Sequence, residues 1–217
     1  MANAITTAMV LRWLERYAGI LAEKKDHLTA LDSAIGDADH GANMHRGFQA
    51  VAAKTPALAG KDLGEIFKAT AMTLISTVGG ASGPLYGTFF LQAGAGLAGR
   101  PSVSPQEFAA SLEKGVAGVI QRGRAALGDK TMVDVLEPTV AALRKTADKG
   151  ELTPSSLAEV AAYAEDCARA TTPLLARKGR ASYLGERSRG HQDPGATSAG
   201  YLFAALAEAF SRPAPES

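Results

Sequence analysis

Alanine accounts for 43 of the 217 residues, and this abundance constrains the fold more than any other feature of the sequence. Alanine has the highest helix propensity of all residues, whereas the β-branched and aromatic runs that favour strands are scarce. The aromatic residues comprise only 7 Phe, 5 Tyr and 1 Trp. We therefore expect an all-α protein.

Helix start and stop signals divide the chain into six to eight helical segments. Ser104, Pro105 and Glu107 form a capping box with proline in the first turn, and Asp62 can cap another helix. Short connections between helices favour an antiparallel bundle or barrel, and we expect eight helices. No internal linker separates them, so residues 1–217 are expected to form a single domain, with 212–217 as a flexible tail. The expected helices are 5–24, 43–54, 62–77, 84–99, 105–127, 132–148, 154–177 and 195–212.

Charge and cysteine content limit the classes of protein to which this sequence can belong. Lys plus Arg total 23 and Asp plus Glu 22, so the large basic excess of many nucleic-acid-binding proteins is absent. Cys167 is the single cysteine, which excludes an internal disulfide and fits a reducing compartment. The sequence shows neither a signal peptide nor an apolar run long enough to span a membrane. We expect a soluble, cytoplasmic protein with no nucleic-acid or membrane partner.

An acidic loop gathers Asp32, Asp37 and Asp39 within eight residues. Carboxylates this close repel one another unless a cation or water compensates them, and oxygen ligands favour Mg²⁺, Mn²⁺ or Ca²⁺. The spacing does not fit an EF-hand, but an ordinary Asp-Gly turn remains an alternative. His40 and Asn43, in the same loop, could contact a phosphate or simply cap a helix.

A glycine-rich loop is a second candidate site, and its backbone suits a phosphate. Residues 78–84 (VGGASGP) lead into an expected helix, where backbone amides can bind an anion, although a close helix crossing would also need glycine. This loop lacks the lysine of a Walker motif. Residues 94–99 match G-x-G-x-x-G, but no strand precedes them, so we exclude a dinucleotide fold.

The third loop is rich in arginine and ends in His191 and Asp193, before the last expected helix. Guanidinium groups bind phosphate oxygens well, although a solvated basic turn is the ordinary alternative. An acidic loop, a glycine loop and an arginine loop on one helical scaffold together favour a magnesium–nucleotide site. The basic residues concerned are Arg177, Lys178, Arg180, Arg187 and Arg189.

These motifs resemble those of a known family, the nucleotide-binding L subunits of dihydroxyacetone kinases. The similar stretches, in the family's order, are IGDADHGANM, TVGGASGPLYGTFF, GDKTMVDV and ARKGRASYLGERSRGHQDPGATS. The resemblance implies an eight-helix antiparallel barrel with ADP or ATP and two Mg²⁺ ions at one end. It implies that Asp32, Asp37 and Asp39 are metal ligands. It implies nucleotide contacts from His40, Gly41, Ala42, Asn43, Ala81, Ser82, Gly123, Met132, Arg180, Asp193, Pro194 and Gly195.

The resemblance also implies how such a chain works. It would contribute no catalytic side chain of its own: bound ADP would accept a phosphoryl group from a phosphohistidine on an M subunit, and the resulting ATP would phosphorylate dihydroxyacetone on a K subunit. A subunit that exchanges free ATP, acting on another triose or tetrose, is an alternative. A nucleotide-sensing regulator, a magnesium-dependent phosphohydrolase and a helical scaffold also remain open, as does assembly into a homodimer.

Overall fold

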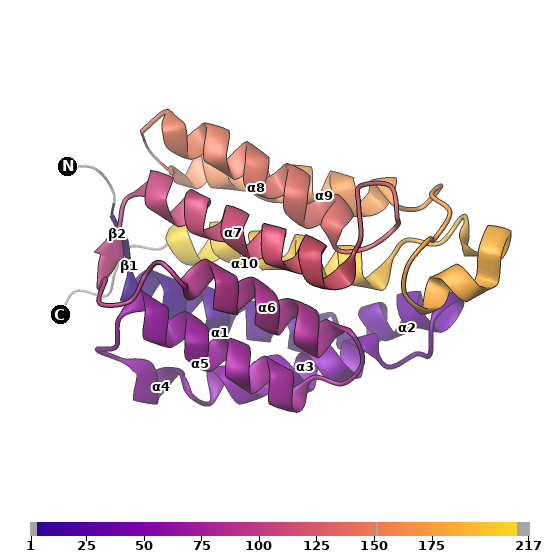
Figure 1. Ribbon diagram of the computed structural model, residues 1–217, viewed down its shortest axis with the longest axis horizontal. Helices are drawn as coiled ribbons and strands as arrows, with labels where there is room; N and C mark the ends of the chain where they lie inside the picture. The colour runs from indigo at the N-terminus through magenta and orange to yellow at the C-terminus, as the bar shows by residue number, and fades with distance from the viewer. Residues whose placement is uncertain (1–3, 151, 212–217) are drawn as a thin grey trace.

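Helices form almost all of the computed structural model, which describes residues 4–150 and 152–211 (Figure 1). Two-residue strands β1 (Ile5–Thr6) and β2 (Ser102–Val103) pair in antiparallel fashion. The expected tail at 212–217 lies outside the described residues. The helices are α1 (Thr7–Glu23), α2 (Lys25–Ile35), α3 (His40–Ala52), α4 (Thr55–Leu58), α5 (Leu63–Thr77), α6 (Ser82–Gly94), α7 (Pro105–Gly123), α8 (Val133–Asp148), α9 (Pro154–Ala170) and α10 (Pro194–Ser211), with a 3₁₀ segment η1 (Arg180–Ser188).

Eight of these helices close into a ring. In the order α1, α3, α5, α6, α7, α8, α9, α10, each helix packs against the next, and α10 returns to pack against α1. Neighbours in the ring run in opposite directions, so that α1 starts and α10 ends where β1 and β2 pair (Figure 1). The all-α, antiparallel eight-helix barrel expected from the sequence is confirmed. Helix α2 lies outside this ring, at the opposite end, beside η1.

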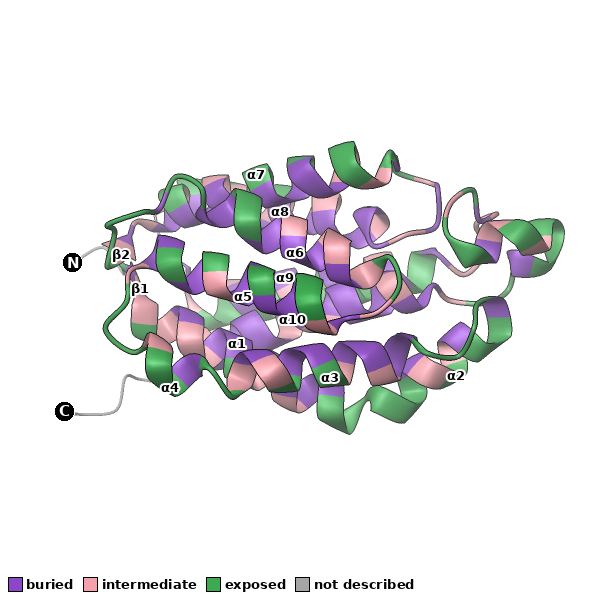
Figure 2. Ribbon diagram, turned by 60° about the horizontal axis from the view of Figure 1, so that its bottom comes forward, coloured by how far each residue is buried: buried purple, intermediate pink, exposed green. Residues whose placement is uncertain are grey.

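Large side chains fill the barrel. The inward faces of the helices are buried and the outward faces exposed (Figure 2). Trp13 of α1 packs against Phe67, Phe90 and Phe108, from three other helices, with ring centroids 6.0–6.5 Å apart. Across the ring's seam, Trp13 Nε1 donates a hydrogen bond to the Leu202 carbonyl oxygen at 2.8 Å. Because the interior is packed, a binding site must lie at an end of the barrel rather than along its axis.

Several expected helix bounds were wrong. The first helix was expected over 5–24, but residues 5–6 form β1, and a separate helix, α2, follows after Lys24 alone. No Gly or Pro marks that break, so the sequence did not reveal it. Helix α6 starts at Ser82 instead of residue 84. Pro84 is tolerated in its first turn because amides there have no hydrogen-bond partner within the helix. Helix α6 ends at Gly94 instead of residue 99.

Two more helices are shorter than expected. Helix α7 ends at Gly123 instead of residue 127, because Arg124 adopts a left-handed conformation with φ 48°. Helix α9 ends at Ala170 instead of residue 177, ahead of Pro173, which has no amide hydrogen to continue the helix. Among the described residues, no helix has both the length and the apolar character to cross a bilayer.

Candidate functional site

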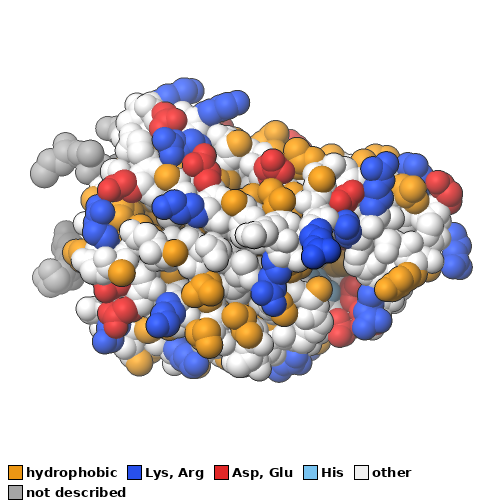
Figure 3. Space-filling model, viewed as in Figure 1, with side chains coloured by type: hydrophobic (Ala, Val, Ile, Leu, Met, Phe, Trp, Pro, Cys, Tyr) orange, Lys and Arg blue, Asp and Glu red, His pale blue; other side chains and the backbone are white. Residues whose placement is uncertain are grey.

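A cavity of about 410 Å³ opens at the end of the barrel away from β1 and β2. Helices α3, α6, α8 and α10 all begin at its wall, and α2 and α7 end there. In Figure 3 acidic side chains and a histidine lie in a hollow at this end, flanked by basic side chains. Of the fifteen residues that the resemblance implies for the site, thirteen line the cavity: Asp32, Asp37, Asp39, His40, Asn43, Ala81, Ser82, Gly123, Met132, Arg180, Asp193, Pro194 and Gly195.

Helix capping differs between the two ends of the barrel. Helices α5, α7 and α9, which start at the far end, have capping boxes from Asp62, Ser104 and Thr153. Helices α3, α6 and α8, which start at the cavity, have N-cap residues whose own side chains make no capping hydrogen bond in the described structure. Asp193 caps α10 at the same cavity, and Asp32 and Thr131 accept from the first amides of α3 and α8, which leaves the start of α6 without a side-chain cap. The positive ends of these helix dipoles meet at the cavity, an arrangement that suits an anionic ligand.

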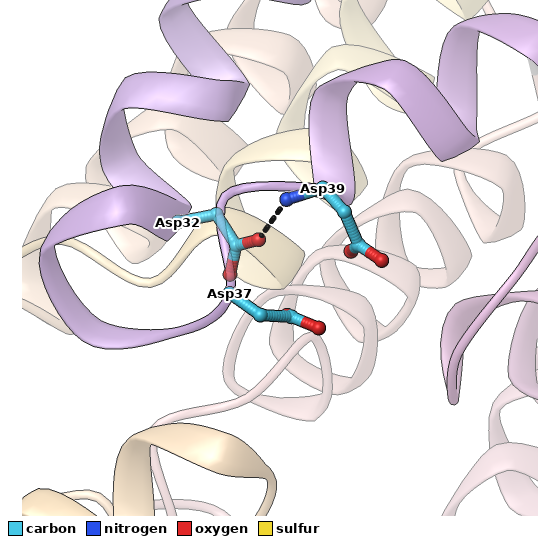
Figure 4. Close-up of side chains that lie close together, drawn as sticks. All are labelled: Asp32, Asp37 and Asp39. Carbon is cyan, nitrogen blue, oxygen red and sulfur yellow. Dashed lines mark hydrogen bonds between the residues drawn. The ribbon is translucent and has the colours of Figure 1, made fainter.

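The acidic cluster is built across two helices and the turn between them (Figure 4). Asp32 lies on α2, not in the loop expected from the sequence, and is 7% exposed. Its Oδ2 accepts hydrogen bonds from the backbone amides of Asp39 at 2.8 Å and His40 at 3.0 Å. Gly36 is required here, because a Cβ at that position would lie 2.0 Å from Asp32 Oδ1. The turn thus fixes Asp32 against the start of α3.

The three carboxylates can share a cation. Oxygen atoms from Asp32, Asp37 and Asp39 lie within 4.8 Å of one another, and the Asp37 and Asp39 side chains point to the same side (Figure 4). Arg180, from η1, reaches the cluster, with its Nε 2.9 Å from Asp37 Oδ2. One guanidinium offsets only part of three negative charges, and an all-oxygen set is what Mg²⁺ prefers. The residues present therefore fit a divalent cation.

His40 connects the cavity to a buried hydrogen-bond network. Its Nδ1 lies 3.2 Å from Ser82 Oγ, and its Nε2 lies 2.9 Å from Ser198 Oγ. Tyr86 OH lies 2.8 Å from the same Ser198 Oγ, and Tyr17 OH donates to the Ser198 carbonyl oxygen at 2.8 Å. Burial lowers the His40 pKa and raises the Tyr86 pKa to about 12. His40 is thus held in place beside the hydroxyl of Ser82, rather than at the surface.

Asp193 is a buried carboxyl at the start of α10. Its Oδ2 accepts a hydrogen bond from the Ala196 amide at 2.7 Å, and its own amide donates to Thr171 Oγ1 at 3.0 Å. Burial raises its pKa to about 7, although Lys130 nearby favours the charged form. Lys130 is 1% exposed, and burial lowers its pKa.

Gly41 and Ala42, implied as nucleotide contacts, are not among the residues that line the cavity. Gly41 allows a close crossing, since a Cβ there would lie 2.1 Å from the Lys25 carbonyl oxygen on α2. A nucleotide contact from either residue remains a prediction. Three residues of the arginine loop also lie elsewhere: Arg189 pairs with Glu186, and Arg177 and Arg187 are outside the cavity lining.

The residues that the sequence analysis did not assign fall into two groups. An apolar wall is formed by Leu85, Val119, Ala125 and Val133 beside Met132. These look like ordinary core residues in the sequence, because burial in a core and burial around a ligand require the same residue types. The buried polar residues Tyr86, Lys130 and Ser198 gave no local signal, since their partners are distant in the chain.

Comparison with known proteins places this geometry in a family. Residues 34–208 match the DAK2 domain. The chain is 48% identical to the ADP-binding subunit DhaL of the PEP-dependent dihydroxyacetone kinase of Escherichia coli K12, over 94% of this chain and 97% of that subunit. It is 42% identical to the corresponding subunit of kinase 1 from Listeria innocua, over 90% and 93% of the two chains.

A solved structure shows the same fold. The dihydroxyacetone kinase of C. freundii in complex with AMP-PNP and Mg²⁺ superimposes with a TM-score of 0.72 at 27% identity, over 96% of this chain. This chain spans about a third of that longer kinase, 35% of its length. The fold, the extent of the domain match and the identity over nearly the whole chain agree. The chain therefore belongs to the DAK2 domain family, together with the ADP-binding DhaL subunits of dihydroxyacetone kinases.

Proposed function

We propose that this chain is the nucleotide-binding subunit of a dihydroxyacetone kinase and holds ADP or ATP with two Mg²⁺ ions in the end cavity. The observation that carries the proposal is the meeting of three carboxylates with the start of α6, whose N-cap side chain makes no capping hydrogen bond, in one cavity. Carboxylates gather cations, and helix starts gather anions, so a magnesium diphosphate satisfies both. Without a ligand, the three carboxylates would repel one another and the amides at the start of α6 would lack an acceptor.

Each part of the cavity has a separate task. Asp32, Asp37 and Asp39 hold the metal ions, which when bound neutralise phosphate charge and so favour phosphoryl transfer. The start of α6, with Ser82, and the guanidinium of Arg180 hold phosphate oxygens. The apolar wall around Met132 takes the base. None of these groups acts as a nucleophile, so the chain's contribution is to bind and orient the nucleotide.

The partners follow from this division of work. We propose that bound ADP accepts a phosphoryl group from a phosphohistidine on an M subunit and that the ATP so formed serves dihydroxyacetone bound on a K subunit. The cavity opens at an end of the barrel, where a second protein can reach it. The single thiol, Cys167, fits work in the reducing cytoplasm. The isolated chain should show little turnover on dihydroxyacetone.

The most direct test is mass analysis of nucleotide in the purified protein before and after dialysis. Retained ADP that becomes phosphorylated when the M subunit and its phosphoryl donor are added would support the proposal. Nucleotide that exchanges freely with ATP would instead favour a subunit that uses free ATP. A protein that binds neither nucleotide in the presence of Mg²⁺ would refute the site itself.

Asp37→Ala tests the metal ligands. Removing one of three carboxylates should lower magnesium-dependent ADP affinity at least tenfold, about 1.4 kcal/mol, with the helical circular dichroism unchanged. Asp26→Ala is the matched control, because Asp26 is an exposed aspartate in the first turn of α2, away from the cavity. Calorimetry that gave the same magnesium–ADP affinity for Asp37→Ala and Asp26→Ala would contradict the assignment.

A further inference from the structure

The segment that carries Arg180 is a loop whose two ends are held together by one side chain. Lys130 Nζ donates hydrogen bonds to the carbonyl oxygens of Thr171 at 2.8 Å, Thr172 at 3.2 Å and Leu174 at 3.2 Å, where the loop leaves α9. It also donates to the carbonyl oxygen of His191 at 2.5 Å, where the loop returns towards α10. Residues 175–190 thus form a loop whose neck is bonded on both sides by one ammonium group, beside a backbone hydrogen bond from the Gly190 amide to the Thr172 carbonyl oxygen at 2.9 Å.

Lys130 is unusually placed for a lysine. Its side chain is 1% exposed, whereas lysine is almost never fully buried unless it is paired. Three ammonium hydrogens serve four carbonyl groups, so the charge is solvated by the protein backbone. The residue also adopts a left-handed conformation, φ 64°, which is uncommon for a residue with a side chain. Such a backbone persists only where surrounding contacts maintain it.

The residues on either side of this neck belong to the candidate site. Two positions after Lys130, Met132 lines the apolar wall, and two after His191, Asp193 directly precedes α10. Within the loop, Arg180 meets Asp37 with an N–O distance of 2.9 Å. A second, exposed contact spans the same neck, in which Arg189 Nη1 donates to the Pro173 carbonyl oxygen at 2.7 Å.

We propose that Lys130 is a positioning residue for nucleotide binding, which closes the neck of the 175–190 loop and thereby places Arg180 against the acidic cluster. It acts through Arg180 rather than on the ligand itself. The inference rests on the proposed nucleotide function, and it extends that function to a residue that the site assignment leaves without a role. Without the ammonium, the neck loses four hydrogen bonds and is held by the fewer contacts that remain, such as Gly190 N to the Thr172 carbonyl oxygen at 2.9 Å, so the loop moves away from the metal site more readily.

The test compares Lys130→Met with Lys145→Met. Methionine keeps an unbranched apolar side chain in place of the lysine stem, and Lys145 is an exposed lysine in the last turn of α8. At a temperature where both variants are folded by circular dichroism, Lys130→Met should release ADP at least tenfold faster than Lys145→Met in the presence of Mg²⁺. Equal release rates would overturn the proposal.

A double-mutant cycle with Arg180→Ala separates positioning from general destabilisation. If Lys130 acts through Arg180, the double variant should bind ADP about as weakly as Arg180→Ala alone. If the two losses multiply, Lys130 does not act through Arg180 and the proposal fails. Should Lys130→Met not fold, Arg189→Ala loosens the same neck from the surface, and the same cycle with Arg180→Ala decides.

Limited trypsin digestion provides a measurement that needs no nucleotide. Lys130→Met should be cut faster than Lys145→Met at the arginines of the 175–190 loop while the rest of the barrel stays intact. If the wild-type protein binds no ADP but this difference in cutting is found, the proposed function fails while the loop closure stands. If ADP binds tightly and both variants are cut at the same rate, the proposed role of Lys130 in closing the loop is refuted while the proposed nucleotide-binding function stands.

Discussion

At the scale of single residues, the acidic turn depends on a small residue as much as on its carboxylates. Asp32 accepts two amide hydrogen bonds from the start of α3, and Gly36 leaves the space in which its carboxylate lies. Carboxylates at a helix start are stabilised by the helix dipole and by amide donors. Asp32 is therefore held in one orientation before any cation binds, which lowers the entropy that binding must overcome.

Gly36→Ala tests this arrangement. The new Cβ would lie 2.0 Å from Asp32 Oδ1, so the carboxylate must move, and we expect about 1–3 kcal/mol lower stability and at least tenfold weaker magnesium–ADP binding. The control is Gly19→Ala in α1, where the Cβ would meet only the end of the Arg16 side chain at 3.3 Å. That control should be up to about 1 kcal/mol more stable, with unchanged affinity. Urea unfolding and calorimetry give both quantities. Unchanged ADP affinity in Gly36→Ala would show that Asp32 is not fixed by this turn.

Asp193 gives a pH dependence whose sign can be stated. Burial raises its pKa from the ordinary 3.8 to about 7, so the folded state keeps a proton that the unfolded state has lost. The stability that the buried, protonated Asp193 side chain contributes is therefore fully present below about pH 4. It falls as the pH rises towards 7 and is constant above that. Asp193→Asn removes this effect while keeping an oxygen that can accept from the Ala196 amide.

The measurement is the melting temperature of nucleotide-free wild type and Asp193→Asn between pH 4.5 and 8. The difference between variant and wild type should become more positive by several degrees up to about pH 7 and then level off, corresponding to up to about 4 kcal/mol. Taking the difference removes the contribution of the other titrating groups. A difference independent of pH would contradict the raised pKa of Asp193.

At the scale of helices, the capping boxes that stabilise helix starts lie at one end of the barrel and the candidate binding site lies at the other. Helices that start at the β1–β2 end are capped by their own sequences, whereas α3, α6 and α8 leave the capping to other groups at the cavity. A helix start with a side-chain cap has satisfied one of its free amides, so it is a poorer anion site. At the cavity, Asp193 caps α10 and Asp32 accepts from the start of α3, so the start of α6, which has no side-chain cap, is the one best suited to a phosphate.

Ser104→Ala and Ser82→Ala separate the two roles. Ser104 caps α7 with an Oγ that accepts from the Glu107 amide at 3.1 Å, so its loss should cost about 1 kcal/mol of stability and leave ADP affinity unchanged. Ser82 begins α6 at the cavity, and its loss should weaken ADP binding several-fold at nearly unchanged stability. Thermal unfolding and ADP titration of both variants are needed. The same pattern in the two variants would contradict the division between ends.

At the scale of the whole molecule, the site exists because the ring closes. The cavity wall combines residues from α2, α3, α6, α7, α8 and α10, which are adjacent only when α10 packs on α1. Contacts such as Trp13 Nε1 to the Leu202 carbonyl oxygen hold that seam. A ligand that binds only the closed ring must stabilise the entire fold by mass action.

Magnesium–ADP should accordingly raise the melting temperature. At a free concentration one hundred times the Kd, the ligand adds about 2.7 kcal/mol, which corresponds to roughly 5–10 °C for a chain of this length. The control is ADP with excess EDTA, which should give little shift because the carboxylates then repel the diphosphate. An equal shift with and without Mg²⁺ would show that the acidic cluster is not part of the binding site.

The sequence by itself determined the fold class and the chemistry of the site. Alanine content and capping signals predicted an all-α bundle or barrel, because helix propensity and caps are local properties that neighbouring residues decide, and the family resemblance specified the eight-helix barrel. The same holds for the acidic turn, since Asp32, Asp37 and Asp39 are brought together by eight residues of chain. The family's motifs extended this prediction to Met132 and Gly123, which carry no chemical signal of their own.

Only the tertiary structure decided what depends on distant partners. It placed Asp32 on α2, buried His40 against Ser198, and made Lys130 the donor to carbonyl groups about 40 and 60 residues further along the chain. No local pattern identifies such residues, because their environment is created when the ring closes and excludes water. A lysine or a histidine in a turn is ordinarily solvated, and only the packing around it converts it into a fixed, buried group.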